Sequence, residues 1–153
     1  SAAYFVMDDA LQTRLLRDPI VMISTDGGHY SSHPRGYGSF AKVIQEYVVK
    51  RKVLSLRAAV HKMTGLSAAT VGLDTVKRGR LAQGWAADVL VFDPKAVAAR
   101  STYERPRVFA RGMSFVVVNG RVVIDEGKAK KRRAGRLLLK PSPDEHKKED
   151  PTH

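Results

Sequence analysis

One short apolar run limits what this chain can fold into. Residues 20–23 are Ile, Val, Met and Ile in succession, with Asp18 and Pro19 before them and Ser-Thr-Asp-Gly-Gly after them. An apolar run without alternation is typical of a strand buried on both faces of a parallel sheet. Helical patterns flank it, and one helix–strand–helix unit cannot cover both faces of such a strand. The first half of the chain is therefore expected to be the end of a larger α/β structure.

The flanking helices are indicated by apolar positions that recur on one helical face. Residues 7–17 form the first of these patterns, and residues 40–51 and 55–64 form two more. Ser55 is a suitable N-cap for the last helix, and Gly65 a suitable stop.

The second half of the chain has the alternation and turn residues of a β structure. Residues 87–92 are expected to form a strand that ends before an Asp-Pro pair. Residues 115–118 and 121–124 are two β-branched runs separated by Asn119 and Gly120. An Asn-Gly pair favours a type I′ turn, which needs positive φ at both central residues, so this segment predicts a tight hairpin.

Composition excludes several classes of protein. The chain has no cysteine, which rules out disulfides and thiolate metal sites. It has no apolar run near the roughly 20 residues needed to cross a bilayer. The start at Ser1 lacks the layout of a signal peptide, so we expect a cytoplasmic protein that does not span a membrane.

The net charge of +12 is concentrated near one end of the sequence. Residues 128–140 contain seven Lys or Arg and no acidic residue. No aromatic side chain interrupts this cluster to stack on bases, so a nucleic-acid partner is not expected. Residues 128–153 are expected to be a solvated, disordered tail.

Asp26 is the first candidate for chemistry, because it follows the expected buried strand and precedes Gly27 and Gly28. Catalytic groups of α/β barrels lie at the carboxyl ends of the strands, and glycines there let a substrate approach the backbone. The same pattern also forms ordinary turns, so it leaves both interpretations open. His29 and His33 lie in a Ser-, Gly- and Pro-rich loop, where solvated or locally hydrogen-bonded rings are expected rather than metal ligands.

Several strings resemble the D-aminoacylase (N-acyl-D-amino-acid deacylase) family of the amidohydrolase superfamily. The most specific are Ser-Thr-Asp-Gly at residues 24–27 and His-Pro-Arg-Gly-Tyr-Gly-Ser-Phe at 33–40. The similarity continues through residues 54–64, 78–94 and 117–123, the last two being similar to segments found across the superfamily.

The resemblance implies a fold class of α/β plus β, the C-terminal part of a metal-dependent-hydrolase (β/α)8 barrel followed by a small β-sandwich segment. Residues 1–72 would end the barrel, 73–127 would form the sandwich segment, and 128–153 the tail. It also implies an enzyme that uses zinc to polarise an amide carbonyl and activate water. The substrate implied is an N-acyl amino acid.

The resemblance assigns roles to individual residues. Asp26 matches the family's catalytic carboxylate, which moves a proton from water to the leaving amine close to the metal and is at most a weak metal ligand. Arg35 matches the arginine that holds the substrate carboxylate, and Asp88 matches a structural carboxylate. The family's principal metal ligands are expected upstream and are absent here. The isolated chain is therefore expected to be inactive and to associate with itself or with the missing barrel portion.

Two alternatives stay open at the level of sequence. The chain could come from another amidohydrolase, such as a cyclic-amide hydrolase of the dihydropyrimidinase type, although the string at residues 33–40 favours the deacylase. It could also be a non-catalytic module that binds acidic partners through its basic cluster.

Overall fold

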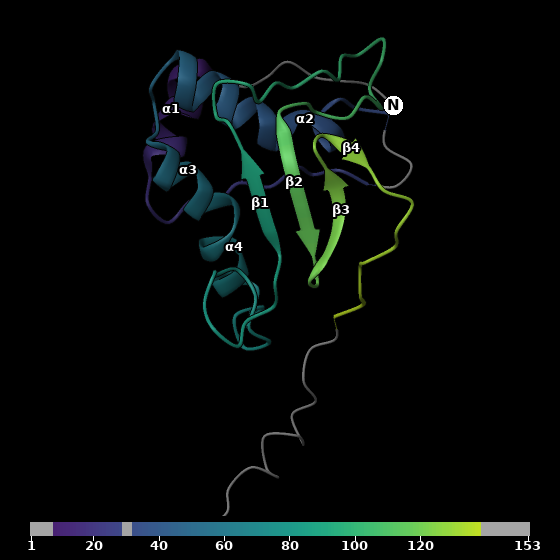
Figure 1. Ribbon diagram of the computed structural model, residues 1–153. Helices are drawn as coiled ribbons and strands as arrows, with labels where there is room; N and C mark the ends of the chain where they lie inside the picture. Colours follow the sequence, from purple (N-terminus) through teal and green to yellow (C-terminus); the bar gives the residue numbers. More distant parts are fainter. Residues whose placement is uncertain (1–7, 29–31, 139–153) are drawn as a thin grey trace, which may run out of the picture.

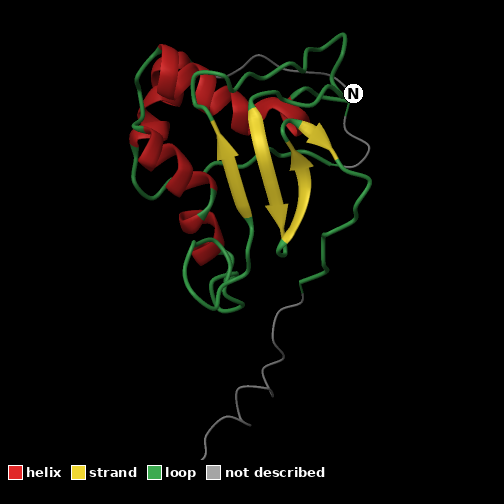
Figure 2. Cartoon of the chain, viewed as in Figure 1, coloured by secondary structure: helices red, strands yellow, loops and turns green. Residues whose placement is uncertain are grey.

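The computed structural model describes residues 8–28 and 32–138 (Figure 1). The helical elements come first and the sheet follows, as the sequence colours of Figure 1 show, and Figure 2 draws these helices in red and the strands in yellow. In chain order they are α1 (Asp9–Arg17), α2 (Arg35–Lys42), the π-helix η1 (Val43–Lys50), α3 (Leu56–Met63), α4 (Gly65–Thr70), β1 (Val89–Phe92), β2 (Met113–Val118), β3 (Arg121–Asp125) and β4 (Lys128–Ala129). No helix in the described residues is long and apolar enough to cross a membrane.

The first helix confirms the sequence prediction from Asp8 onward, and Met7 lies outside the described residues. The Asp8 side chain caps α1 by accepting a hydrogen bond of 2.8 Å from the Leu11 amide. The guanidinium of Arg51 binds both carboxylate oxygens of Asp9 at 2.8 Å. This bidentate contact joins the start of α1 to the end of η1.

The predicted buried strand at residues 20–23 is not formed among the described residues. Ile20 lies in a turn and is 82% exposed, and residues 21–23 belong to no helix or strand of the described structure. The Ile23 amide donates instead to the Lys62 carbonyl at 3.2 Å, and its side chain packs against the helices. A parallel strand needs neighbours on both sides, and the described chain supplies none.

The later helices differ from the sequence prediction at their ends. The helix expected over residues 40–51 begins earlier, at Arg35, and changes to π geometry at Val43. Ser55 caps α3 as predicted, accepting a 3.1 Å hydrogen bond from the Ala58 amide. α3 ends at Met63 with Thr64 as its C-cap, directly before Gly65 as predicted, and Gly65 is the first residue of the separate helix α4.

The sheet is an antiparallel meander with the order β1-β2-β3-β4. Asn119 and Gly120 have φ of 49° and 74°, which confirms the predicted tight turn between β2 and β3. The expected disorder from residue 128 onward is wrong for β4, since Ile124 of β3 pairs with Ala129.

Two apolar clusters hold the elements together. One lies among α1, η1 and α3 and includes Leu16, Tyr47 and Ala59. The other joins α2 and η1 to Val97, with Phe92 and Met113 packed against it. Figure 1 accordingly shows the helices beside β1 and behind the upper end of β2, where Met113 begins that strand. The second cluster ties the helical half of the chain to the sheet half.

Asp88 has the structural role expected of it. Its Oδ1 accepts a 2.7 Å hydrogen bond from the Asn119 amide, and its Oδ2 binds the Arg78 guanidinium. Arg78 also donates to the Asn119 side chain, whose amide donates in turn to the Ala134 carbonyl at 2.6 Å. This network fixes the hairpin turn against the segment before β1 and the segment after β4.

Replacing Asp88 with Ala should lower the free energy of unfolding by about 1–2 kcal/mol, because the Asn119 amide and Arg78 lose an ionised acceptor. Urea denaturation checks this prediction. Asp125→Ala is the matched control, since it breaks only the exposed ion pair with Lys130 and should cost about 0–1 kcal/mol. Equal losses in both variants would contradict a network role for Asp88.

The hydrogen bond from Arg51 lowers the pKa of the Asp9 carboxyl below its ordinary 3.8. Because the folded-state pKa is lowered, the pair stabilises the fold above that ordinary value, and the contribution is lost as pH falls through the folded pKa. NMR titration of the Asp9 carboxyl carbon should therefore give a midpoint below 3.8. Arg51→Gln should return the midpoint to the ordinary range, and an unchanged midpoint would contradict the assignment.

Candidate functional site

Asp26 lies near the end of the segment that follows α1, and its carboxylate faces solvent. Its side chain is 80% exposed. Its φ of 48° is in the left-handed region, which Asp tolerates better than most side chains. The Asp26 amide donates to the Ser24 hydroxyl at 3.4 Å, a local turn contact. The backbone therefore turns at Asp26 and presents its carboxylate outward.

Arg35 is the partner of that carboxylate. It is the first residue of α2, and its Nη2 lies 2.8 Å from Asp26 Oδ2. Its Nε also donates to the Asp26 backbone carbonyl at 3.2 Å. The structure thus brings together the two site residues predicted from sequence, nine positions apart. At 46% exposure, the Arg35 side chain remains open to a ligand.

Close backbone contact sets the separation of the two segments that hold these residues. A Cβ at position 27 would lie only 2.7 Å from the Gly36 Cα. A Cβ at position 36 would meet the Gly27 Cα at an ordinary 3.5 Å. Gly27 is therefore required by packing, which adds a structural reason to the substrate access expected from the sequence.

A loop from the second half of the chain contacts the two residues that precede Arg35. Ser101 Oγ donates to the Pro34 carbonyl at 2.9 Å, and the Tyr103 hydroxyl lies 3.4 Å from His33 Nε2. The other ring nitrogen of His33 accepts a hydrogen bond from the Arg35 amide at 3.1 Å. His33 is thus locally hydrogen-bonded as expected, and His61 is exposed as expected. His29 lies outside the described residues.

A cavity of about 470 Å³ adjoins Arg35 and is lined by both halves of the chain. The first half contributes Leu16, Ile23 and Tyr47, and the loop of the second half contributes Ser101 and Tyr103. Asp26 is not among its lining residues, so the cavity opens beside the arginine and away from the carboxylate.

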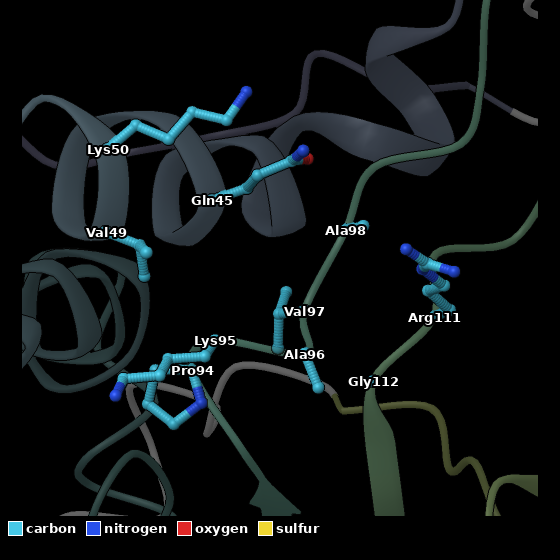
Figure 3. A pocket seen from close by; sticks show the side chains of 10 residues that line it. All are labelled: Gln45, Val49, Lys50, Pro94, Lys95, Ala96, Val97, Ala98, Arg111 and Gly112. Atoms are coloured by element: carbon cyan, nitrogen blue, oxygen red, sulfur yellow. The ribbon is translucent and has the colours of Figure 1, made fainter.

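A second cavity, of about 450 Å³, lies between η1 and the segments at residues 94–98 and 111–112 (Figure 3). Its lining includes Lys50, Lys95 and Arg111 and no acidic residue. In Figure 3 the charged ends of the two lysines point apart rather than toward a common centre. It does not touch Asp26 or Arg35 and is separate from the candidate site.

The described residues do not form a metal centre. No group of three or more His, Asp or Glu side chains in residues 8–28 and 32–138 is arranged to hold an ion. Asp26, the one weak candidate ligand, is paired with a guanidinium. One exposed carboxylate in such a pair falls short of the three or four protein ligands typical of zinc sites.

Comparison with known proteins identifies the family to which most of the chain is similar. The Amidohydrolase family profile matches residues 11–124, most of the chain. The chain belongs to this family. It is 40% identical to the N-acyl-D-aspartate deacylase of Alcaligenes xylosoxydans xylosoxydans over 139 residues, which is 90% of this chain and 28% of that protein. It is also 40% identical to the D-aminoacylase of the same organism over 141 residues, 91% of this chain and 29% of that protein.

Solved structures of this amidohydrolase group have the same fold over the matched part. A D-aminoacylase crystal structure superposes with a TM-score of 0.81 at 39% identity, covering 90% of this chain and 29% of that one. The N-acyl-D-glutamate deacylase of Bordetella bronchiseptica superposes with a TM-score of 0.77 at 38% identity, covering 88% and 28%. That enzyme was solved with zinc and a phosphonate mimic of the tetrahedral intermediate. The chain therefore spans a little more than a quarter of the length of these relatives.

Gly27→Ala should lower the free energy of unfolding by about 1–3 kcal/mol, because the new methyl group forces the two site segments apart. Gly36→Ala is the matched control, since the added Cβ meets only an ordinary contact and a helical position favours Ala over Gly. Thermal unfolding of both variants checks the prediction. A Gly27→Ala variant as stable as Gly36→Ala would show that the close approach does not constrain the site.

Proposed function

We propose that this chain is the C-terminal part of a zinc-dependent amidohydrolase that deacylates N-acyl-D-amino acids. The single observation on which this rests is the exposed pair of Asp26 and Arg35, joined at 2.8 Å in a chain of this family. Relatives at 40% identity are named as deacylases of N-acyl-D-aspartate and N-acyl-D-glutamate. Since the chain covers 28% of each of these, the activity belongs to the longer protein.

The two side chains would have different roles, one in substrate recognition and the other in proton transfer. Arg35 would bind the carboxylate of the N-acyl amino acid, for which a planar guanidinium fork is well suited. Asp26 would accept a proton from the attacking water and deliver it to the leaving amine nitrogen. The amide C–N bond then breaks, giving a free amino acid and a carboxylic acid.

The ion pair links these two roles. Without substrate, Arg35 neutralises Asp26 through the 2.8 Å contact. A substrate carboxylate that binds the guanidinium competes with Asp26 for it and weakens its hold on that carboxylate. Substrate binding would thereby leave the Asp26 carboxylate free to accept a hydrogen bond from the attacking water.

Zinc would be held by side chains outside the described residues. Within those residues the only candidate ligand is Asp26, which alone does not make a site. When bound, zinc would supply polarisation of the amide carbonyl and activation of water. The zinc found in the Bordetella deacylase supports this assignment for the longer protein.

The missing part of the fold would complete a (β/α)8 barrel, with residues 73–127 as part of a small β-sandwich. The exposure of the segment at residues 20–23 supports this proposal, because Ile20 and Met22 are 82% and 40% exposed. Neighbouring strands would cover them and turn the segment into the buried strand that its sequence predicts. The isolated chain would be inactive and would associate through such surfaces.

In the full-length protein with zinc, Asp26→Asn should lower kcat on an N-acetyl-D-amino acid by about 10²–10⁴-fold, because the general base is lost. Steady-state kinetics measure this effect. Asp125→Asn, on β3 and distant in sequence from the site, should leave kcat unchanged. Near-wild-type turnover of Asp26→Asn, or a preference of the wild-type protein for ring amides, would refute the proposal.

Arg35→Met in the same protein should raise KM for the substrate by about 10–100-fold, since a charge-assisted contact is worth roughly 1.5–3 kcal/mol. The increase should disappear for an analogue in which a carboxamide replaces the carboxylate. Arg57→Met, at an exposed position of α3, is the matched control. An equal increase in KM for both substrates would argue against a carboxylate contact.

A further inference from the structure

The loop at residues 99–104, in the second half of the chain, contacts the residues at the start of α2. Ser101 is 67 positions from Pro34, and Tyr103 is 70 positions from His33. The Tyr103 and His33 rings meet edge to face, with centroids 5.1 Å apart and an interplanar angle of 79°. These contacts come from outside the strings that define the site, and they reach the two residues directly before Arg35.

His33 transmits the Tyr103 contact to the Arg35 backbone. Its Nδ1 accepts from the Arg35 amide at 3.1 Å, so that nitrogen does not bear a proton. A neutral imidazole then has its hydrogen on Nε2, the atom that faces the Tyr103 hydroxyl at 3.4 Å. The Tyr103 oxygen is therefore the acceptor, and its position favours the tautomer that binds Arg35.

Ser101 contacts the other residue that precedes Arg35, Pro34. The Pro34 carbonyl already accepts from the Tyr37 amide at 3.2 Å and the Gly38 amide at 3.0 Å within the first turn of α2, and Ser101 Oγ adds a third donor at 2.9 Å. A Cβ on Gly38 would collide with Ser101 Oγ, so Gly38 provides the space that this hydroxyl occupies. Pro34 makes no side-chain cap to α2, and the His33 ring instead accepts from the Arg35 amide at the start of the helix.

We propose that Tyr103 and Ser101 are positioning residues for the Arg35 guanidinium, acting through His33 and Pro34. This inference rests on the proposed function of Arg35 as the substrate-carboxylate clamp. The two contacts fix the backbone at the first residue of α2, and so the direction in which the Arg35 side chain leaves it. Losing either contact lets that backbone move and weakens carboxylate binding, while the Asp26 amide keeps its contact with the Ser24 hydroxyl.

The first test uses Tyr103→Phe and Ser101→Ala in the full-length, zinc-loaded protein. Each should raise KM for an N-acetyl-D-amino acid about 5–20-fold and leave kcat within twofold. The effect should vanish for the carboxamide analogue, which Arg35 does not clamp. Ser114→Ala, at an exposed position of β2, should leave both constants unchanged. A fall in kcat with unchanged KM, or equal effects on both substrates, would overturn the proposal.

The second test asks whether Tyr103 acts through His33. His33→Asn places an amide oxygen close to the position of Nδ1, so it can still accept from the Arg35 amide but cannot reach Tyr103. Adding Tyr103→Phe to His33→Asn should then raise KM no further. His33→Gln, which mimics Nε2 instead, should be worse than His33→Asn. Independent, additive effects of the two substitutions would overturn the relay.

A third measurement separates this inference from the proposed function. Hydrogen exchange of the peptide covering residues 32–40 in the full-length protein should be faster in Ser101→Ala and Tyr103→Phe, and unchanged in Ser114→Ala. If the wild-type protein deacylates no substrate, the proposed function fails, but faster exchange would still support positioning of Arg35. Unchanged exchange in both variants would overturn the positioning role whatever the activity.

Discussion

The buried ammonium group of Lys62 holds the segment on which the candidate site is built. Lys62 is 4% exposed, and its Nζ donates to the Asp18 carbonyl and, at 2.7 Å, to the Val21 carbonyl. Its own backbone carbonyl accepts from the Ile23 amide. A buried ammonium group is costly unless its hydrogens are bonded to acceptors, so the Lys62 side chain needs both carbonyl contacts. Through them α3 fixes the segment at residues 18–23, which no strand of the described residues supports, and Asp26 follows three residues after Ile23.

The apolar cluster among the helices also supports the helix that carries Arg35. Ile23 packs against the cluster that contains Leu16 and Val43, and Val43 continues directly from α2 into η1. The segment that leads to Asp26 and the helix that begins with Arg35 therefore share one apolar core. The contact between Gly27 and Gly36 then sets their separation at the surface. A 2.8 Å ion pair between exposed side chains can be maintained here because both backbones are fixed below it.

The structural features that the sequence predicted correctly are local ones. The Asn-Gly hairpin and the Ser55 cap depend on residues a few positions apart, and both are present. The strand at residues 20–23 depends on hydrogen-bond partners that the described chain does not contain, so its apolar pattern could not make it a strand. The contact between Tyr103 and His33 spans 70 positions and has no local signal. The sequence motifs identified Asp26 and Arg35 as candidates, but only the structure shows that the loop at residues 99–104 contacts the residues before Arg35.

The two site residues differ in what they depend on. The described hydrogen bonds of Asp26 come from Ser24 and Arg35, all within the first half of the chain. Arg35 sits on a helix that also packs on Val97 and receives the loop at residues 99–104. The Asp26 backbone is therefore held within the first half of the chain, whereas the backbone of Arg35 is also held by the second half. Under the proposed function, changes in that loop can alter how a substrate is held while the local contact between Asp26 and Ser24 remains.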